Sequence, residues 1–280
     1  MLACVRRSDL ITCVALALFG AGAAMAEAPK RVVSMNLCTD QLAMLLAAPG
    51  QLVSVSHLAS DPFASSMVAE ARAYPVNRGQ AEQVFLMRPD LVLAGTYTAQ
   101  ATVRLLQDLG VPVVQVPPVE SLAEGAAQIR QIGAALGQQV RAEAMAAEFE
   151  AGVAALHYDG PRATAAFYYP NGYTSSAESL ASEVIARAGF DNIAAEIGVS
   201  TSGRLSLEDL LMAAPDVIIT SDQYPGYSNA EALFDHPALA VIRAQAGAEV
   251  VSNADWGCGT PHILRALAEM VALHKKLALP

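Results

Sequence analysis

Two cysteines are the side chains in this chain with the most direct capacity for covalent or metal chemistry. Cys38 and Cys258 are the cysteines that follow residue 26. They could pair, contact a metal centre or remain free. The elements inferred below place them in loops of different halves of the chain, on opposite sides of a cleft for a large ligand. Because a disulfide needs Cα atoms within about 7 Å, we expect free, partly buried thiols.

Five histidines could in principle hold a bare metal ion. A Zn²⁺ or Mn²⁺ site of three histidines and a carboxylate needs ligands that converge to about 2 Å from the metal. His157 and His274 fall in predicted helices, and His236 precedes a proline in a loop. Only His57 and His262 are expected in ligand-facing loops. A bare-metal site is therefore an alternative that the sequence disfavours.

A secreted hydrolase or thiol enzyme is the alternative from another functional class. Cys258 with His262, or Ser202 with His57, could act as nucleophile and base. The chain has no G-x-S-x-G nucleophile elbow and no Walker A or G-x-G-x-x-G phosphate loop. We therefore expect a binding protein, not an enzyme.

The aromatic residues are concentrated in segments that are expected to be loops. Six of the eight Tyr and the one Trp lie in or beside predicted ligand-facing loops: Tyr97, Tyr168, Tyr169, Tyr173, Tyr224, Tyr227 and Trp256. Loop Tyr and Trp side chains suit a large, flat ligand, because each offers apolar area and a polar tip. Tyr168 and Tyr169 point to opposite faces of a strand end, so we expect at least one to be buried. About half of the seven are expected to contact ligand.

Charge in the predicted cleft loops is sparse. Arg78 and Arg204 are the basic candidates, and Asp61 and Asp222 are the acidic ones. A strongly anionic ligand would favour more arginines, so a neutral or weakly charged metal chelate fits better. The net charge of −10 and the lack of a Lys/Arg-rich run argue against nucleic acid as a partner.

Short β-branched runs alternate with helical patterns along the chain. Strands are predicted at 31–34, 52–56, 90–94, 111–116, 164–169, 216–220 and 249–252. Helices are predicted at 40–48, 81–87, 99–109, 179–188, 207–212 and 262–277. This alternation indicates an α/β fold in which parallel sheets carry helices on both faces.

The two halves of the chain share a detailed pattern. Glu82 and Glu208 are each followed by six residues, a Pro-Asp pair and a buried strand. The prolines at 89 and 215 should stop a helix. Because this pattern recurs at the same place in the strand and helix order of each half, we infer an internal duplication.

A long helical stretch separates the halves. Gly137 is expected to break it, leaving a helix at 138–157 about 30 Å long. We therefore divide the chain into an N-terminal lobe (27–136), a linker helix (137–159) and a C-terminal lobe (160–280). Ligands of parallel sheets bind outside the carboxyl ends of the strands, so the cleft loops are expected at 35–39, 57–61, 77–80, 95–98, 170–175, 200–204, 222–228 and 254–260.

Residues 1–26 have the pattern of a secretory signal peptide. Arg6 and Arg7 precede an apolar run that ends in Ala24-Met25-Ala26, an A-x-A cleavage site. The apolar run is shorter than the roughly 20 residues that span a bilayer. We expect cleavage after residue 26, localisation to an oxidising periplasm and a monomeric protein.

Several segments together resemble the class III solute-binding proteins of ABC importers. They include RVVSMNLCTDQL, EQVFLMRPDLVLAG, PDVIITSDQY and SNADWGCGTPH, and the resemblance covers about 31–277. It implies two Rossmann-like lobes joined by a single long helix, with the ligand cleft between them. It also implies a ligand such as cobalamin or another corrinoid, a ferric siderophore or haem, and no resident cofactor.

The resemblance also implies roles for individual residues. In family members that bind vitamin B12, one glutamate on each lobe docks onto arginines of the permease dimer, and Glu82 and Glu208 match these by position. A capping role at the helix starts is the alternative, with Ser206 and Asp209 resembling a capping box. The expected ligand-binding residues are Cys38, His57, Arg78, Tyr97, Tyr173, Arg204, Tyr224, Tyr227 and Trp256.

Overall fold

A computed structural model describes residues 27–199, 203–226 and 228–277. The predicted signal peptide, Ser202 and Tyr227 lie outside the described residues. Within those ranges, no helix combines the length and the apolar character that crossing a bilayer would require.

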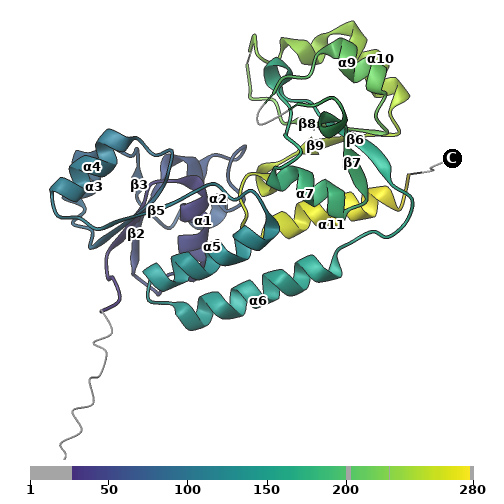
Figure 1. Cartoon of the computed structure of the whole chain (residues 1–280). Coiled ribbons are helices and arrows are strands. Elements are labelled where there is room, and N and C mark those ends of the chain that lie inside the picture. The colour runs from purple at the N-terminus through teal and green to yellow at the C-terminus, as the bar shows by residue number, and fades with distance from the viewer. Residues whose placement is uncertain (1–26, 200–202, 227, 278–280) are drawn as a thin grey trace, which may run out of the picture.

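Two separate parallel sheets form two α/β lobes (Figure 1). The first sheet has the order β3-β2-β1-β4-β5, and the second has the order β7-β6-β8-β9. The strands are β1 (Val32–Ser34), β2 (Leu52–Ser56), β3 (Val76–Asn77), β4 (Leu91–Gly95), β5 (Val113–Val116), β6 (Ala163–Phe167), β7 (Phe190–Asn192), β8 (Val217–Ser221) and β9 (Ala248–Ser252). The predicted fold class is confirmed.

Eleven α-helices connect and cover these strands in the described part of the chain. They are α1 (Leu37–Leu46), α2 (Val68–Ala71), α3 (Ala81–Leu86), α4 (Gln100–Asp108), α5 (Leu122–Ala135), α6 (Gln139–Ala155), α7 (Leu180–Arg187), α8 (Ile193–Glu196), α9 (Leu207–Ala213), α10 (Pro237–Gln245) and α11 (Ile263–His274). Short 3₁₀ turns lie at His57–Ser60, Pro170–Gly172, Ala232–Asp235 and Ala254–Trp256. The predicted elements are all present, whereas β3, β7, α2, α8 and α10 were not predicted.

The two Pro-Asp elements end their helices in the same way. Arg88 precedes Pro89 with φ of 51°, and Ala214 precedes Pro215 with φ of 42°. A residue before proline is disfavoured in the helical region, so the chain leaves α3 and α9 at these left-handed positions. The matching conformations support the predicted internal duplication.

The aspartates of the two Pro-Asp elements also make equivalent hydrogen bonds. The Asp90 carboxylate accepts the backbone N–H groups of Lys30 and Arg31 at 2.7 and 2.8 Å, just before β1. The Asp216 carboxylate accepts the backbone N–H and the hydroxyl of Thr164 in β6 at 2.7 and 2.8 Å. Each aspartate thus ties the start of β4 or β8 to the neighbouring central strand.

One hydrophobic core runs through both lobes. It includes Val32 of β1, Phe149 of α6, Phe167 of β6 and Met270 of α11, all at most 1% exposed. Figure 1 shows α5, α6, α7 and α11 along the base of the molecule, between the two sheets. This shared base joins the lobes firmly on the side away from the strand tips.

The predicted break between the two long helices is confirmed. Gly137 has φ of +71° between α5 and α6. The two helices then pack closely, because a Cβ at Gly133 would lie 2.0 Å from the Cβ of Ala142. Only glycine allows the helix backbones to approach this far.

Candidate ligand-binding site

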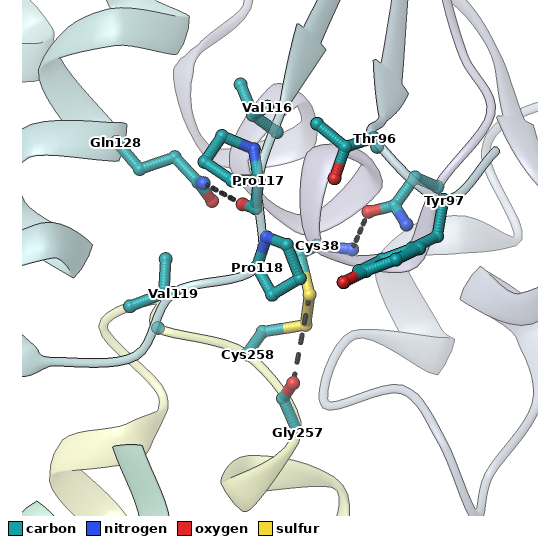
Figure 2. A pocket seen from close by; sticks show the side chains of 13 residues that line it. Cys38, Thr96, Tyr97, Val116, Pro117, Pro118, Val119, Gln128, Gly257 and Cys258 are labelled. Carbon is teal, nitrogen blue, oxygen red and sulfur yellow. Dashed lines mark hydrogen bonds between the residues drawn. A yellow bond between two sulfur atoms is a disulfide. The ribbon is translucent and has the colours of Figure 1, made fainter. Parts of the chain in front are cut away.

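The loops that leave the carboxyl ends of both sheets meet at a cleft, as open parallel sheets predict. A pocket of about 120 Å³, here called the proline pocket, lies at the tips of the first sheet. Asn36, Tyr97, Pro117, Pro118 and Gln128 line it together with Cys38 and Cys258. Figure 2 shows Tyr97 and Pro118 on either side of the two sulfur atoms.

The start of α1 forms part of the floor of this pocket. The Asn36 side chain caps the helix by accepting the backbone N–H groups of Cys38 and Thr39 at 3.0 and 3.4 Å. This cap fixes the first turn of α1. It also requires glycine at position 95, because a Cβ there would lie 2.8 Å from the Asn36 amide nitrogen. The Asn36 cap and the close approach of Gly95 therefore fix the position of Cys38 in the first turn of α1.

Cys38 and Cys258 form a disulfide, so the prediction of free thiols is wrong. Their Cα atoms lie 5.5 Å apart, although the two residues belong to different lobes. The prediction assumed that ligand would separate them, but they lie at the cleft floor, where the lobes touch. A Cβ at Gly259 would lie 2.5 Å from Val119, and one at Gly125 would lie 2.7 Å from the carbonyl oxygen of Gly259.

The disulfide also removes one candidate chemistry. A bonded sulfur at Cys258 has no thiolate, so a nucleophile at this position with His262 as base is not formed. Ser202, the other candidate nucleophile, lies outside the described residues. In the ranges that the structure describes, no three His, Cys, Asp or Glu side chains are grouped so that they could hold a metal ion.

A second pocket of about 310 Å³, here called the aromatic pocket, lies at the tips of the second sheet. Four aromatic side chains line it: Phe63, Tyr169, Tyr224 and Trp256. Asp222 and Glu231 line it as well. Gly257 lines both pockets, so the two pockets lie next to each other.

The lobes also touch across the aromatic pocket. The rings of Phe63 and Tyr224 have centroids 4.6 Å apart, and the Tyr224 hydroxyl donates to the Asp61 carboxylate at 3.4 Å. Desolvation and the charge of Asp61 raise the pKa of Tyr224, so its hydroxyl remains a donor at neutral pH. Phe63 and Tyr224, from opposite lobes, thus meet in the lining of the aromatic pocket.

Of the residues predicted to bind ligand, four line the two pockets: Cys38, Tyr97, Tyr224 and Trp256. Tyr97 is 88% exposed, whereas Trp256 is 8% exposed and packs edge-on against Phe167. Tyr169 lines the aromatic pocket and Tyr168 is buried, which confirms the prediction that one of this pair is buried.

The other predicted ligand residues do not line either pocket. His57 and Arg78 are exposed at the ends of β2 and β3. Arg204 lies 5.0 Å from the centre of the Tyr173 ring and faces a groove beside α9. Tyr227 lies outside the described residues.

Several lining residues were missed by the sequence analysis. Pro117, Pro118 and Val119 directly follow β5, so the rule about carboxyl ends of strands would have identified them. Gln128 is placed by a hydrogen bond from its side chain to the carbonyl oxygen of Pro117, at 2.8 Å. Phe63 lies in an irregular segment, and no local pattern in the sequence marks it.

Buried polar groups beneath the cleft fix the loops that form it. The Asp40 carboxylate is fully buried and accepts the hydroxyl and the backbone N–H of Ser56 at 2.5 and 3.0 Å. Burial raises the pKa of Asp40 to about 6, against the opposing effect of its hydrogen bonds with Ser34 and Ser56. In the other lobe, Arg265 pairs with Asp255 beside Trp256, and this pairing lowers the pKa of Asp255 although burial opposes it.

Glu82 and Glu208 lie exposed in the first turns of α3 and α9, one on each lobe. The Ser206 hydroxyl caps α9 by accepting the backbone N–H of Asp209. Within the described residues, neither glutamate carboxylate makes a hydrogen bond or an ion pair. Exposed apolar side chains stand beside each one, with Leu86 79% and Met212 84% exposed.

Comparison with known proteins gives a consistent picture. Residues 32–252 match the family model described as "Periplasmic binding protein". A cobalamin-binding protein of Halobacterium salinarum (strain ATCC 29341 / DSM 671 / R1) is 30% identical over 69% of this chain and 54% of that protein. The match therefore spans about half of that relative. A vitamin B12-binding protein of Yersinia pestis (strain Pestoides F) is 26% identical over 88% of this chain and 86% of that protein.

Solved structures share the fold at low identity. The periplasmic haem-binding protein RhuT from Roseiflexus sp. RS-1 has a TM-score of 0.74 and 23% identity, over 89% of this chain and 99% of that one. The vitamin B12 binding protein BtuF of Vibrio cholerae has a TM-score of 0.67 and 18% identity, over 89% and 98%. The Fe³⁺-hydroxamate transport protein of Saccharomonospora viridis has a TM-score of 0.67 and 22% identity, over 89% and 94%.

Proposed function

Because the chain belongs to the periplasmic binding protein family, we propose that it is the substrate-binding component of an ABC importer for a metal chelate. Family members deliver their ligands to ABC transporter permeases. In this proposal the chain acts in the periplasm as a monomer after cleavage of residues 1–26. Residues 27–136 and 160–280 are its lobes, and residues 137–159 connect them.

One observation carries this proposal. At the strand tips of the two parallel-sheet lobes lie two adjacent pockets, which are lined by Tyr97, Pro118, Tyr169, Tyr224 and Trp256. Aromatic and proline walls with few charges suit a bulky amphipathic guest. A catalytic site would need a nucleophile and a base within hydrogen-bond reach, and the disulfide takes Cys258 out of that role. Binding and release, not turnover, is therefore the proposed activity.

The proposed ligand is a corrinoid such as cobalamin or a ferric siderophore. The relatives named above for cobalamin and vitamin B12 support a corrinoid, and the hydroxamate transport protein supports a siderophore. The aromatic pocket, at about 310 Å³, is at the small end of ligand pockets, which run from about 300 to 1,000 Å³. A chelate larger than this pocket must part Phe63 from Tyr224 or protrude from the cleft.

Fluorescence of Trp256 gives a direct test, because it is the chain's one tryptophan. Titration with cyanocobalamin, haemin, ferrichrome and ferrioxamine B should quench it at micromolar concentration for at least one chelate, since these chromophores absorb light and would lie against the ring. The Trp256→Phe variant, titrated by calorimetry, separates optical quenching from binding. Failure of all four chelates to bind the wild type would rule out the proposed ligand class.

The exposed glutamates support a site for the permease on each lobe. Glu82 and Glu208 occupy matching positions of the duplicated element, and each stands beside exposed apolar side chains. Two equivalent carboxylates fit a permease dimer whose two subunits present basic residues. The cap of α9 is made by Ser206, so the carboxylate of Glu208 is free for a partner.

Charge reversal tests the docking role. Glu82→Arg together with Glu208→Arg should abolish chelate uptake in cells while the affinity for chelate in solution stays within about twofold of the wild type. Glu148→Arg together with Glu269→Arg, exposed substitutions on α6 and α11, changes the net charge by the same amount and serves as the control. Loss of chelate affinity in the double variant would contradict docking and place these residues in ligand binding or in the stability of the lobes.

A further inference from the structure

The aromatic pocket combines two features that favour a positive charge. Four aromatic residues line it, Phe63, Tyr169, Tyr224 and Trp256, and so do the acidic residues Asp222 and Glu231. Aromatic rings attract cations through the negative charge on their faces, most strongly where water is excluded. Carboxylates add a long-range attraction of the same sign.

The lining of the pocket does not supply a balancing cation, and the nearby Arg243, which shares a hollow with Asp222, is paired with Glu249. In the part of the chain that the structure describes, neither the aromatic pocket nor the proline pocket is lined by Lys, Arg or His. Arg265, which contacts the same loop, is paired with Asp255. Asp61 adds a third carboxylate through its contact with Tyr224. The residues that line the aromatic pocket therefore carry a net negative charge.

The tryptophan adds an electron-rich wall to this pocket. Trp256 lines it and is 8% exposed. Its indole N–H is enclosed by protein, so a guest in the pocket contacts the accessible part of the ring and not the N–H. The ring thus adds to the attraction for a cation.

We propose that the aromatic pocket binds a positively charged group of the imported chelate, such as an ammonium arm, against the rings of Tyr224 and Trp256 and beside the carboxylates of Asp222 and Glu231. This inference rests on the proposed function and refines it. The protein should prefer chelates that are cationic over neutral ones, and neutral ones over chelates such as haemin that carry free carboxylates.

Matched ligand pairs test the sign of the charge without changing the chelate. Ferrioxamine B carries a free ammonium arm, and its N-acetylated form is the same iron complex without that charge. Cyanocobalamin with an aminoalkyl arm on its ribose, and the N-acetylated form of that derivative, provide the same comparison for a corrinoid. In each series that binds, we expect calorimetry to give an affinity about 3- to 30-fold higher for the ammonium form.

Protein variants then assign the preference to the pocket. In Asp222→Asn with Glu231→Gln, the ammonium and acetyl forms should bind within about twofold of each other, and raised salt should reduce the wild-type preference. Glutamine at 231 keeps an oxygen for the backbone N–H of Tyr224, which Glu231 accepts at 3.3 Å. Glu148→Gln on α6 removes a charge outside both pockets and should keep the wild-type preference.

Two negative outcomes are distinct. Measurable binding with equal affinity for the ammonium and acetyl forms in the wild type, or a preference that persists in the double variant, would overturn this inference and leave the proposed function intact. Absence of binding by any chelate, haemin included, would overturn the proposed function and the inference together.

Discussion

Removal of the disulfide between Cys38 and Cys258 is the perturbation whose effect follows most directly from the structure. The bond joins residues 220 positions apart in sequence. In the chain-entropy account, a cross-link across a loop of this length destabilises the unfolded chain by about 5 kcal/mol. Measured losses for native disulfides are about 2–5 kcal/mol, so we expect Cys38→Ser with Cys258→Ser to lower the free energy of unfolding by about 3–5 kcal/mol.

Urea unfolding followed by circular dichroism is the appropriate assay, with the oxidised wild type, the reduced wild type and the double serine variant side by side. The reduced protein and the variant should agree within about 1 kcal/mol, because both lose the same cross-link and keep the same core. Thiol titration of the folded, unreduced wild type should find no reactive thiol. A free-energy difference below about 0.5 kcal/mol between the oxidised protein and the variant would refute the reasoning from loop length.

The cleft should respond to the same change, because the bond lies at its floor where the lobes meet. Chelate association should become faster in the double serine variant, since the lobes lose a covalent restraint on their separation. Stopped-flow quenching of Trp256 measures this rate. Unchanged association and dissociation rates would mean that the shared base alone sets how far the lobes open.

Three further substitutions test the packing and electrostatics described above. The pKa of Asp40 is about 6 in the folded protein and near 3.8 ordinarily, so its contribution to the free energy of unfolding is largest below pH 4 and falls by up to about 3 kcal/mol as the pH rises past 6. Urea unfolding at pH values from 4 to 7 should therefore show this pH-dependent loss of stability in the wild type and not in Asp40→Asn. Free energies of unfolding that change in parallel with pH in the two proteins would contradict it. Asp216→Ala leaves the backbone N–H of Thr164 without its acceptor and should cost about 1–3 kcal/mol in urea unfolding, whereas an unchanged midpoint would show that water replaces the carboxylate. Gly133→Ala places a methyl group against Ala142 and should lower stability by about 1–3 kcal/mol, and a thermal midpoint equal to the wild type would show that the helices separate without penalty.

The order of the elements could be predicted from sequence because each one carries a local signal. The β-branched runs, the helix-stopping prolines and the repeated Pro-Asp pair act over a few residues. The elements that escaped prediction have weak local patterns. β3 is only Val76–Asn77, and β7 is the three residues Phe190–Asn192, so both depend on pairing with a neighbouring strand.

The site was predictable in part for the same reason. Tyr97, Tyr224 and Trp256 follow strands, and their position after a strand end is visible in sequence. The pairing of Cys38 with Cys258 depends on how closely two lobes approach, which is set by glycines at 125 and 259. That approach is a property of the tertiary fold. Arg204 stays a prediction: its side chain stacks on Tyr173 and lines a groove beside α9, apart from the two pockets at the strand tips.

The hydrophobic core that crosses from one lobe to the other has a consequence for how the chain can be divided. Phe149 on α6 and Met270 on α11 belong to the same cluster as Val32 and Phe167. Either half expressed by itself would present this apolar surface to water and aggregate. Domain-swapping or half-protein complementation would therefore require co-expression of both fragments, in contrast to two-domain proteins whose units meet through a thin, polar interface.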